Sequence, residues 1–212
     1  MMDGIIFDVD GTLWDARAAV AEAWEDAAEQ CTGQKIHVSM ETLTKTFGLT
    51  TDVVMGRLFP QTTAEQRVEI EKICRHRLLG TLKKYPGKLY PGVEHMLQVL
   101  SEESPVFIVS NCQKGYIETL LESKGLEKYV TAYCSYGDTG LSKAANIQAI
   151  MTEYQLRSAI YVGDMEGDAM AAREAGIPIL YVTYGFGDVK NADYSADTTA
   201  DVVDILKNEV KR

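Results

Sequence analysis

Four short apolar runs alternate with helical patterns along most of this chain, and this alternation restricts the fold more than any other feature. The runs cover residues 4–9, 106–110, 159–163 and 178–183. A short uninterrupted apolar run is typical of a strand covered on both faces. Strands that alternate with helices predict an α/β fold with a doubly wound parallel sheet.

One segment, residues 16–83, breaks the alternation because it carries only helical signals. Among them is a capping box, in which Thr63 is followed three positions later by Gln66. A stretch of about seventy helical residues is too long for a simple crossover, which normally needs one helix. We therefore expect two domains: a core formed by residues 1–15 and 84–212, and an inserted all-helical cap formed by residues 16–83.

Charge and composition exclude several classes of protein. The formal net charge of -10 argues against a nucleic-acid surface, because phosphate backbones are held by clustered Lys and Arg. Apolar stretches are too short for a membrane span, and the N-terminus lacks the basic start of a signal peptide. We expect a cytoplasmic protein with reduced, mostly buried cysteines. No feature of the sequence indicates an oligomeric state.

Two aspartates, Asp8 and Asp10, stand where the first apolar run ends. On a strand they would point to the same face, and carboxylates that close raise each other's pKa unless a positive charge lies nearby. Mg²⁺ meets this need, since it prefers few carboxylates together with phosphate oxygens. Gly11 and Thr12 would then form a turn that approaches an anion, although Asp10 and Gly11 are also a common turn pair.

The same pattern recurs after the third run, where Gly163 and Asp164 are followed by Asp168. Ligands of doubly wound sheets bind at the carboxyl ends of the strands. We therefore expect Asp164 and Asp168 to converge with Asp8 and Asp10, an arrangement that favours a cation. Asp168 has the alternative role of capping the helix that follows.

Candidate phosphate ligands follow the second run. Ser110 and Asn111 offer a hydroxyl and an amide to a phosphate oxygen, or they cap a helix that begins near Lys114. Lys143, beside the candidate helix cap Ser142, offers the positive charge that a phosphoryl group requires.

In this order, these pieces resemble the four motifs of the haloacid dehalogenase superfamily of phosphatases. The matching residues are Asp8 to Thr12 for the first motif, Ser110 for the second, Lys143 for the third, and Gly163, Asp164 and Asp168 for the fourth. The helical insertion is similar to the C1 cap of this family, so the resemblance spans nearly the whole chain.

Two further segments refine the resemblance. The segment "TYGFG" near Gly185 is similar to phosphoglycolate-phosphatase-like members. One departure is Met165 followed by Glu166, where many relatives carry Thr or Ser, and this removes a hydroxyl near the site.

The resemblance implies a Mg²⁺-dependent phosphatase that acts on a small phosphorylated metabolite. Asp8 would attack phosphorus to form an aspartyl-phosphate, and Asp10 would protonate the leaving oxygen and later take a proton from water. Mg²⁺ would be held by Asp8, by the backbone carbonyl of Asp10 and by Asp164, with Asp168 acting directly or through a water. The phosphoryl oxygens would be held by Ser110, Lys143, Thr12 and Asn111.

Other functions remain open at this point. The same core serves phosphosugar mutases, which pass the phosphoryl group to a second hydroxyl, and a non-catalytic phospho-ligand binding protein could keep the same fold. A dehalogenase is disfavoured because relatives with that activity lack an aspartate at the position of Asp10. Candidates for substrate specificity are Trp14, Arg17, Thr46 and Arg57. For Trp14 we favour packing within a helix, and for Arg57 we favour a solvated helix position.

Overall fold

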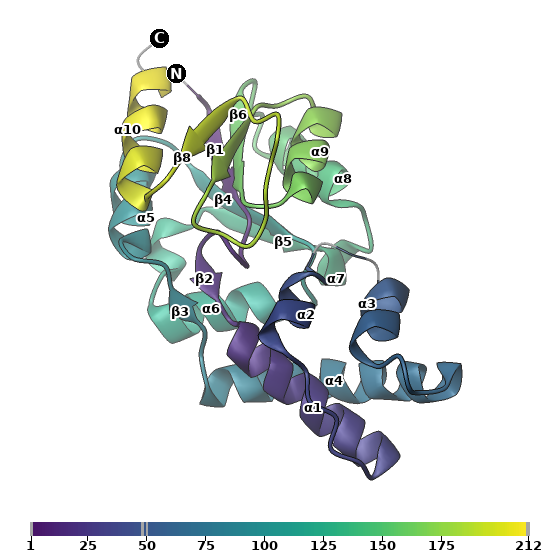
Figure 1. Cartoon of the computed structure of the whole chain (residues 1–212). Coiled ribbons are helices and arrows are strands. Elements are labelled where there is room, and N and C mark those ends of the chain that lie inside the picture. The colour runs from purple at the N-terminus through teal and green to yellow at the C-terminus, as the bar shows by residue number, and fades with distance from the viewer. Residues whose placement is uncertain (1, 48, 50, 211–212) are drawn as a thin grey trace. The chain divides into compact units, whose positions relative to one another are not determined.

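Two compact units make up the chain, whose computed structural model describes residues 2–47, 49 and 51–210 (Figure 1). The first unit comprises Met1–Asp15 and Lys88–Arg212, and the second comprises Ala16–Gly87. Helix α4 (Ala64–Lys84) runs past residue 83, where the sequence analysis ended the insertion, so the division falls after Gly87. The role of the second unit as a cap stays a prediction.

A six-stranded sheet forms the centre of the first unit, with the strand order β5-β4-β1-β6-β7-β8 (Figure 1). Its strands are β1 (Gly4–Phe7), β4 (Val106–Ser110), β5 (Ala132–Ser135), β6 (Ala159–Gly163), β7 (Ile179–Val182) and β8 (Tyr194–Ala196). Every neighbouring pair is parallel. The chain winds outward from β1 in both directions, which confirms the doubly wound parallel sheet.

The four apolar runs of the sequence became the four inner strands of the sheet. Strands β1, β4 and β6 are buried along their whole length, whereas the edge strands β5 and β8 are buried only at their last residue and half-buried or exposed elsewhere. An edge strand is covered less, so its residues need not be uniformly apolar. This is why the sequence analysis missed β5 and β8.

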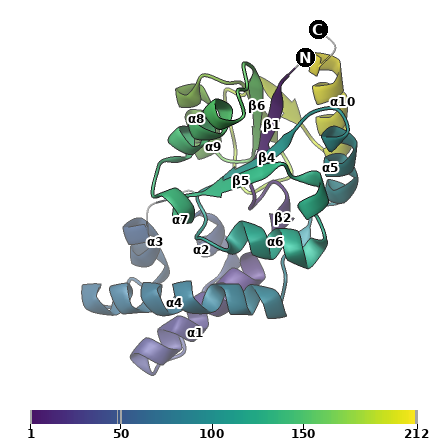
Figure 2. The ribbon, with the colours of Figure 1, turned by 180° about the vertical axis from the view of Figure 1, so that it is seen from behind.

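Helices cover both faces of this sheet (Figures 1 and 2). Helices α5 (Val93–Ser101) and α10 (Thr199–Val210) pack together on one face, and α8 (Lys143–Glu153) and α9 (Glu166–Ala175) pack together on the other. The side chains of Ile6, Phe107 and Tyr161 join α8 and α9 in one apolar cluster. The shorter helices of this unit are α6 (Tyr116–Lys124), the 3₁₀ helix η1 (Glu127–Tyr129) and α7 (Tyr136–Thr139).

The two chain crossings between the units lie side by side within the first unit. Strand β2 (Trp14–Asp15) pairs antiparallel with β3 (Lys88–Leu89), so that Trp14 stands opposite Leu89. The backbone amide of Tyr90 also donates to the carbonyl of Leu13 at 3.1 Å. The point where the chain leaves the first unit and the point where it returns are therefore held together by hydrogen bonds.

The described part of the second unit is helical, with α1 (Arg17–Thr32), α2 (Met40–Thr44), α3 (Thr51–Leu58) and α4. Helices α1 and α4 pack against each other, and the buried residues of α1 are mainly alanines. Small side chains allow two helix axes to approach closely. Trp24 packs against Phe59 with ring centroids 6.1 Å apart, as expected for a packing aromatic.

Two findings concern membranes and thiols. Within the described ranges, no helix has the length and apolar character that a membrane crossing requires. All four cysteines are free, as expected, but Cys74 alone is buried, and the other three are half-buried.

The capping box of α4 forms as the sequence predicts. The Gln66 amide donates to Thr63 Oγ1 at 3.2 Å, and the Thr63 amide donates to Gln66 Oε1 at 2.9 Å. We expect Thr63→Ala to lower the free energy of unfolding of the helical unit by about 1 kcal/mol, because the helix loses its N-cap acceptor. Denaturant titration followed by circular dichroism measures this, and Thr63→Ser, which keeps the hydroxyl, serves as the control. Equal stability of Thr63→Ala and the native protein would contradict the capping role.

Candidate active site

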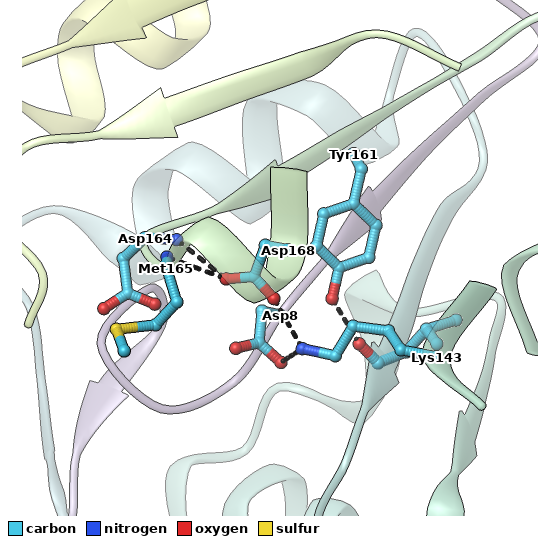
Figure 3. A network of polar contacts seen from close by, with 7 residues as sticks. Asp8, Lys143, Tyr161, Asp164, Met165 and Asp168 are labelled. Carbon is cyan, nitrogen blue, oxygen red and sulfur yellow. Dashed lines mark hydrogen bonds and ion pairs between the residues drawn. The ribbon is translucent and has the colours of Figure 1, made fainter. Parts of the chain in front are cut away.

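Three charged side chains form a buried network where β1 ends (Figure 3). Lys143 Nζ lies 3.0 Å from Asp8 Oδ1 and 2.6 Å from Asp168 Oδ1. Lys143 is the first residue of α8, and Ser142 caps this helix by accepting from the Ala145 amide. Burial acts to lower the pKa of Lys143, but the charges of Asp168 and Asp8 raise it well above its ordinary value. The ammonium therefore stays charged.

Asp164 completes a group of three carboxylates at the same place. Asp8, Asp164 and Asp168 each offer an oxygen, and these oxygens lie within 4.8 Å of one another. Asp164 Oδ2 accepts the Phe186 amide at 2.7 Å, whereas Asp164 Oδ1 is buried without a hydrogen-bond partner. Burial, with the charges of Asp168 and Asp8, raises the pKa of Asp164 to about 8.

A divalent cation fits this arrangement. A buried, unpartnered carboxylate oxygen costs free energy, and close carboxylates repel each other unless a cation neutralises them. Hard oxygen ligands of this kind suit Mg²⁺. The cluster of Asp8, Asp164 and Asp168 thus has the chemistry of a metal site.

Asp168 caps the helix that follows, the alternative role that the sequence analysis considered, and it also binds Lys143. Its Oδ2 accepts the backbone amides of Asp164 at 3.1 Å and Met165 at 2.9 Å, so it caps α9. Its Oδ1 is bound to Lys143. The helix cap therefore also fixes the orientation of the carboxylate that holds the lysine.

Asp10 lies outside this network and contacts two aromatic side chains instead. Asp10 Oδ1 accepts the Tyr116 hydroxyl at 2.8 Å and the Trp14 indole N–H at 3.2 Å. Burial raises the pKa of Asp10 to about 7, although the hydrogen bond from Tyr116 opposes this. Strand β1 ends at Phe7, so the expectation that Asp8 and Asp10 share one face of a strand is wrong.

Ser110 and Asn111 follow the second run as expected, at the carboxyl end of β4. Ser110 is buried and is the last residue of the strand, and Asn111 is exposed. Helix α6 begins at Tyr116 with Gly115 at its N-cap and no side-chain cap. The alternative that Ser110 and Asn111 cap this helix is therefore wrong.

Thr12 is fully buried, and its Oγ1 has no hydrogen-bond partner. Its carbonyl accepts the hydroxyl of Tyr184 at 3.1 Å. The Tyr184 ring also packs against Tyr90, with centroids 4.9 Å apart. The backbone of the turn after β1 is thus held in place, and a buried donor hydroxyl remains available within it.

The specificity candidates of the helical unit make hydrogen bonds inside that unit. Arg17 Nη1 donates to Thr44 Oγ1 at 2.9 Å, Thr46 Oγ1 donates to the Leu43 carbonyl at 2.6 Å, and Arg57 Nη1 donates to the Lys45 carbonyl at 2.9 Å. These bonds give each side chain a structural role.

Trp14 differs from its expected place in a helix. It is fully buried in β2, and its ring meets Tyr116 edge-on at a centroid distance of 5.5 Å. The period of the apolar residues could not reveal this short strand, because it comprises only Trp14–Asp15.

Two glycines allow the backbone to approach Asp164 closely. A Cβ on Gly185 would lie 2.2 Å from the Asp164 Cβ, and a Cβ on Gly11, whose φ is +82°, would lie 2.0 Å from Asp164 Oδ2. The close approach of residue 185 brings the Phe186 amide to Asp164. Sequence reasoning found the segment "TYGFG" only through resemblance and did not find this contact.

Comparison with known proteins agrees with the geometry. A family model described as "Haloacid dehalogenase-like hydrolase" matches residues 5–182, so the chain belongs to this family. A phosphoglycolate phosphatase of Photobacterium profundum is 27% identical over 96% of this chain and 95% of its own length. One from Synechococcus elongatus is 29% identical over 95% of this chain and 96% of its own length.

The fold has close neighbours among solved structures. A haloacid dehalogenase-like family hydrolase from Streptococcus pneumoniae superposes with a TM-score of 0.82 at 21% identity, covering 97% of this chain and 98% of the other. The expected assignment to the phosphoric monoester hydrolases is confirmed by the family and by the curated relatives.

The raised pKa values predict how stability depends on pH when metal is absent. A carboxyl whose pKa is raised on folding favours the folded state while it is protonated. Its contribution to the free energy of unfolding is lost as pH rises from its pKa in the unfolded chain to its pKa in the folded protein. For Asp10 and Asp164 these values are about 7 and about 8. In chelator, the free energy of unfolding should therefore fall as pH rises from about 4, near the ordinary pKa of an aspartate, to about 7 for Asp10 and about 8 for Asp164, by up to about 1.4 kcal/mol per pH unit for each carboxyl, and level off above that.

Thermal unfolding with chelator or with Mg²⁺ tests this dependence. Mg²⁺ should raise the melting temperature most at the alkaline end, because it binds the ionised carboxylates. Asp164→Asn should flatten the pH dependence in chelator and reduce the Mg²⁺ effect. A melting temperature that rises with pH in chelator would contradict the assignment.

Substitution of Gly185 tests the contact with Asp164. We expect Gly185→Ala to weaken Mg²⁺ binding about tenfold or more, because the new Cβ must displace Asp164 or the Phe186 amide. Isothermal titration measures the affinity. The control is Gly167→Ala in α9, where an added Cβ meets no atom within 4 Å. Unchanged affinity in Gly185→Ala would show that the close approach does not position Asp164.

Proposed function

We propose that this chain is a Mg²⁺-dependent phosphatase that hydrolyses a small phosphorylated metabolite through an aspartyl-phosphate on Asp8. The observation that carries the proposal is the pairing of Asp8 with Lys143 beside the unpartnered Asp164 Oδ1. A carboxylate and a fixed positive charge lie here beside an unpartnered oxygen that would take a cation. This supports the proposal, because phosphoryl transfer depends mainly on positioning and charge stabilisation.

Asp8 is the nucleophile in this proposal. Its Oδ1 is bound to Lys143, which leaves Oδ2 to attack phosphorus. A bond forms between Asp8 and phosphorus while the bond from phosphorus to the ester oxygen breaks. Lys143 offsets the negative charge that accumulates between Asp8 and the phosphoryl oxygens.

Asp10 moves the protons. It gives a proton to the departing ester oxygen, and in the second half of the reaction it takes one from the water that attacks the aspartyl-phosphate. A pKa of about 7 suits both directions, because the carboxyl gains and loses a proton near neutral pH.

The remaining residues bind the metal and the phosphoryl group. Asp8, Asp164 and the backbone carbonyl of Asp10 would hold Mg²⁺, with Asp168 acting directly or through a water. When bound, Mg²⁺ supplies positive charge to the phosphoryl oxygens. Donors to these oxygens would be Ser110, Asn111, Thr12 and Lys143.

Phosphoglycolate is the first substrate to test, because the curated relatives that match nearly the whole chain are phosphoglycolate phosphatases. The helical unit Ala16–Gly87 is proposed as the cap that selects the substrate. Cytoplasmic location is part of the same proposal.

Phosphate release from a panel of phosphorylated metabolites tests the function. With Mg²⁺, we expect the native protein to hydrolyse at least one of phosphoglycolate, sugar phosphates and nucleotides. Asp8→Asn should lower kcat by roughly three orders of magnitude or more, because the nucleophile is lost. Asp204→Asn, the same change at an exposed position of α10, is the matched control.

The outcomes separate the alternatives. Full activity of Asp8→Asn would overturn the role of Asp8. Transfer of the phosphoryl group to a sugar hydroxyl in place of water would show a mutase. No turnover of any ester by the native protein would overturn the proposed function.

A further inference from the structure

The two donors to Asp10 converge on one oxygen of its carboxyl. The Tyr116 hydroxyl and the Trp14 indole N–H both point to Oδ1, at 2.8 Å and 3.2 Å. A carboxyl oxygen has two lone pairs, so two donors occupy its acceptor capacity. The other oxygen, Oδ2, has no donor among the described side chains that contact Asp10.

The chemistry of the indole bears on where the proton of Asp10 resides. An indole N–H donates and never accepts, so a proton on Oδ1 would leave one lone pair there for two donors and would require the Tyr116 hydroxyl to turn and accept. A proton on Oδ2 keeps both hydrogen bonds as they are, so the arrangement favours this site for the proton of the neutral carboxyl. Oδ1 remains an acceptor in both protonation states, and the carboxyl can lose and regain its proton without rotating.

Local structure holds both donors rigidly. Trp14 and Tyr116 are buried and pack edge to face with an interplanar angle of 86°. The Gly11 amide donates to the Trp14 carbonyl at 3.0 Å, and the Trp14 amide donates to the Val9 carbonyl at 3.2 Å. This tight loop places the indole beside Asp10, while β3 holds Trp14 from the other side.

The position of Tyr116 is fixed by the start of α6. Gly115, with a φ of 86°, turns the chain into the helix, and Tyr116 is its first residue. The donors thus come from segments about a hundred positions apart that meet at one oxygen.

We propose that Tyr116 and Trp14 are positioning residues that hold Oδ1 of Asp10 as a fixed acceptor and thereby dedicate Oδ2 to proton transfer. The inference rests on the proposed function, because it assigns the oxygen through which Asp10 acts. In the first step the proton on Oδ2 passes to the ester oxygen as its bond to phosphorus breaks and the bond to Asp8 forms. In the second step Oδ2 takes a proton from water as the water oxygen binds phosphorus and Asp8 is released.

Dependence on the leaving group tests this role. An alkyl phosphate needs a proton on its leaving oxygen, whereas nitrophenolate departs from p-nitrophenyl phosphate without one. The ratio kcat/KM reports only the steps through departure of the leaving group, so the later attack of water does not affect it. We expect Tyr116→Phe, which keeps the ring and removes the hydroxyl, to lower kcat/KM for the best alkyl phosphate about tenfold or more. For p-nitrophenyl phosphate the loss should stay below about threefold.

A second variant and a control guard against general loss of structure. Trp14→Phe removes the other donor. It should lower kcat/KM for the alkyl phosphate more than kcat/KM for p-nitrophenyl phosphate, as in Tyr116→Phe. Tyr181→Phe removes a hydroxyl that donates to the Gly187 carbonyl at 2.9 Å, away from Asp10, and should leave the ratio between the two esters unchanged. Melting temperatures show that each variant is folded.

Each outcome has a definite meaning. Unequal losses in Tyr116→Phe and Trp14→Phe support the positioning role. Equal losses for both esters, or no loss in either variant, overturn it and leave the proposed function intact. A native protein that hydrolyses neither ester overturns the proposed function, and the positioning role falls with it.

Discussion

The buried ion pair of Lys143 with Asp8 and Asp168 is the interaction on which the rest of the site depends. It joins the end of β1 and the first turns of α8 and α9, three places far apart in the sequence. Burying an ammonium is costly unless its partners are close, and removal of one partner leaves a charge without compensation. The arrangement of these elements around the sheet is therefore tied to this buried ion pair.

A common pattern governs the acidic side chains around this pair. In each of three carboxyls one oxygen is held by donors from the fold: the amides of residues 164 and 165 hold Asp168, the amide of residue 186 holds Asp164, and two aromatic donors hold Asp10. The second oxygen of Asp168 accepts from Lys143, and the second oxygen of Asp164 has no hydrogen-bond partner. In the proposed function, the free oxygen of Asp164 would bind a cation and the second oxygen of Asp10 would carry a proton. Fixed dipoles that need no rearrangement during a reaction are the main source of electrostatic catalysis.

Sequence reasoning succeeded where the physical constraint was local. Buried inner strands must be apolar, so their ends and the adjoining Asp8 and Asp164 could be located, and the structure brings these two together with Lys143 and Asp168. It failed where partners are distant in sequence. No sequence pattern links Tyr116 to Asp10. The edge strands β5 and β8 are not uniformly buried, so they lack the continuous apolar runs from which the inner strands were predicted.

The pairing of β2 with β3 has a consequence for how such a chain can diversify. Because Trp14 and Leu89 are neighbours across an antiparallel pair, the chain leaves the core and returns to it at nearly the same point. Bringing the two ends of the inserted segment together costs conformational entropy, and the pairing of β2 with β3 offsets this cost. The cost grows only slowly with the length of the insert. The core can therefore accept helical inserts of different size and sequence, with the cluster of Asp8, Asp164 and Asp168 undisturbed.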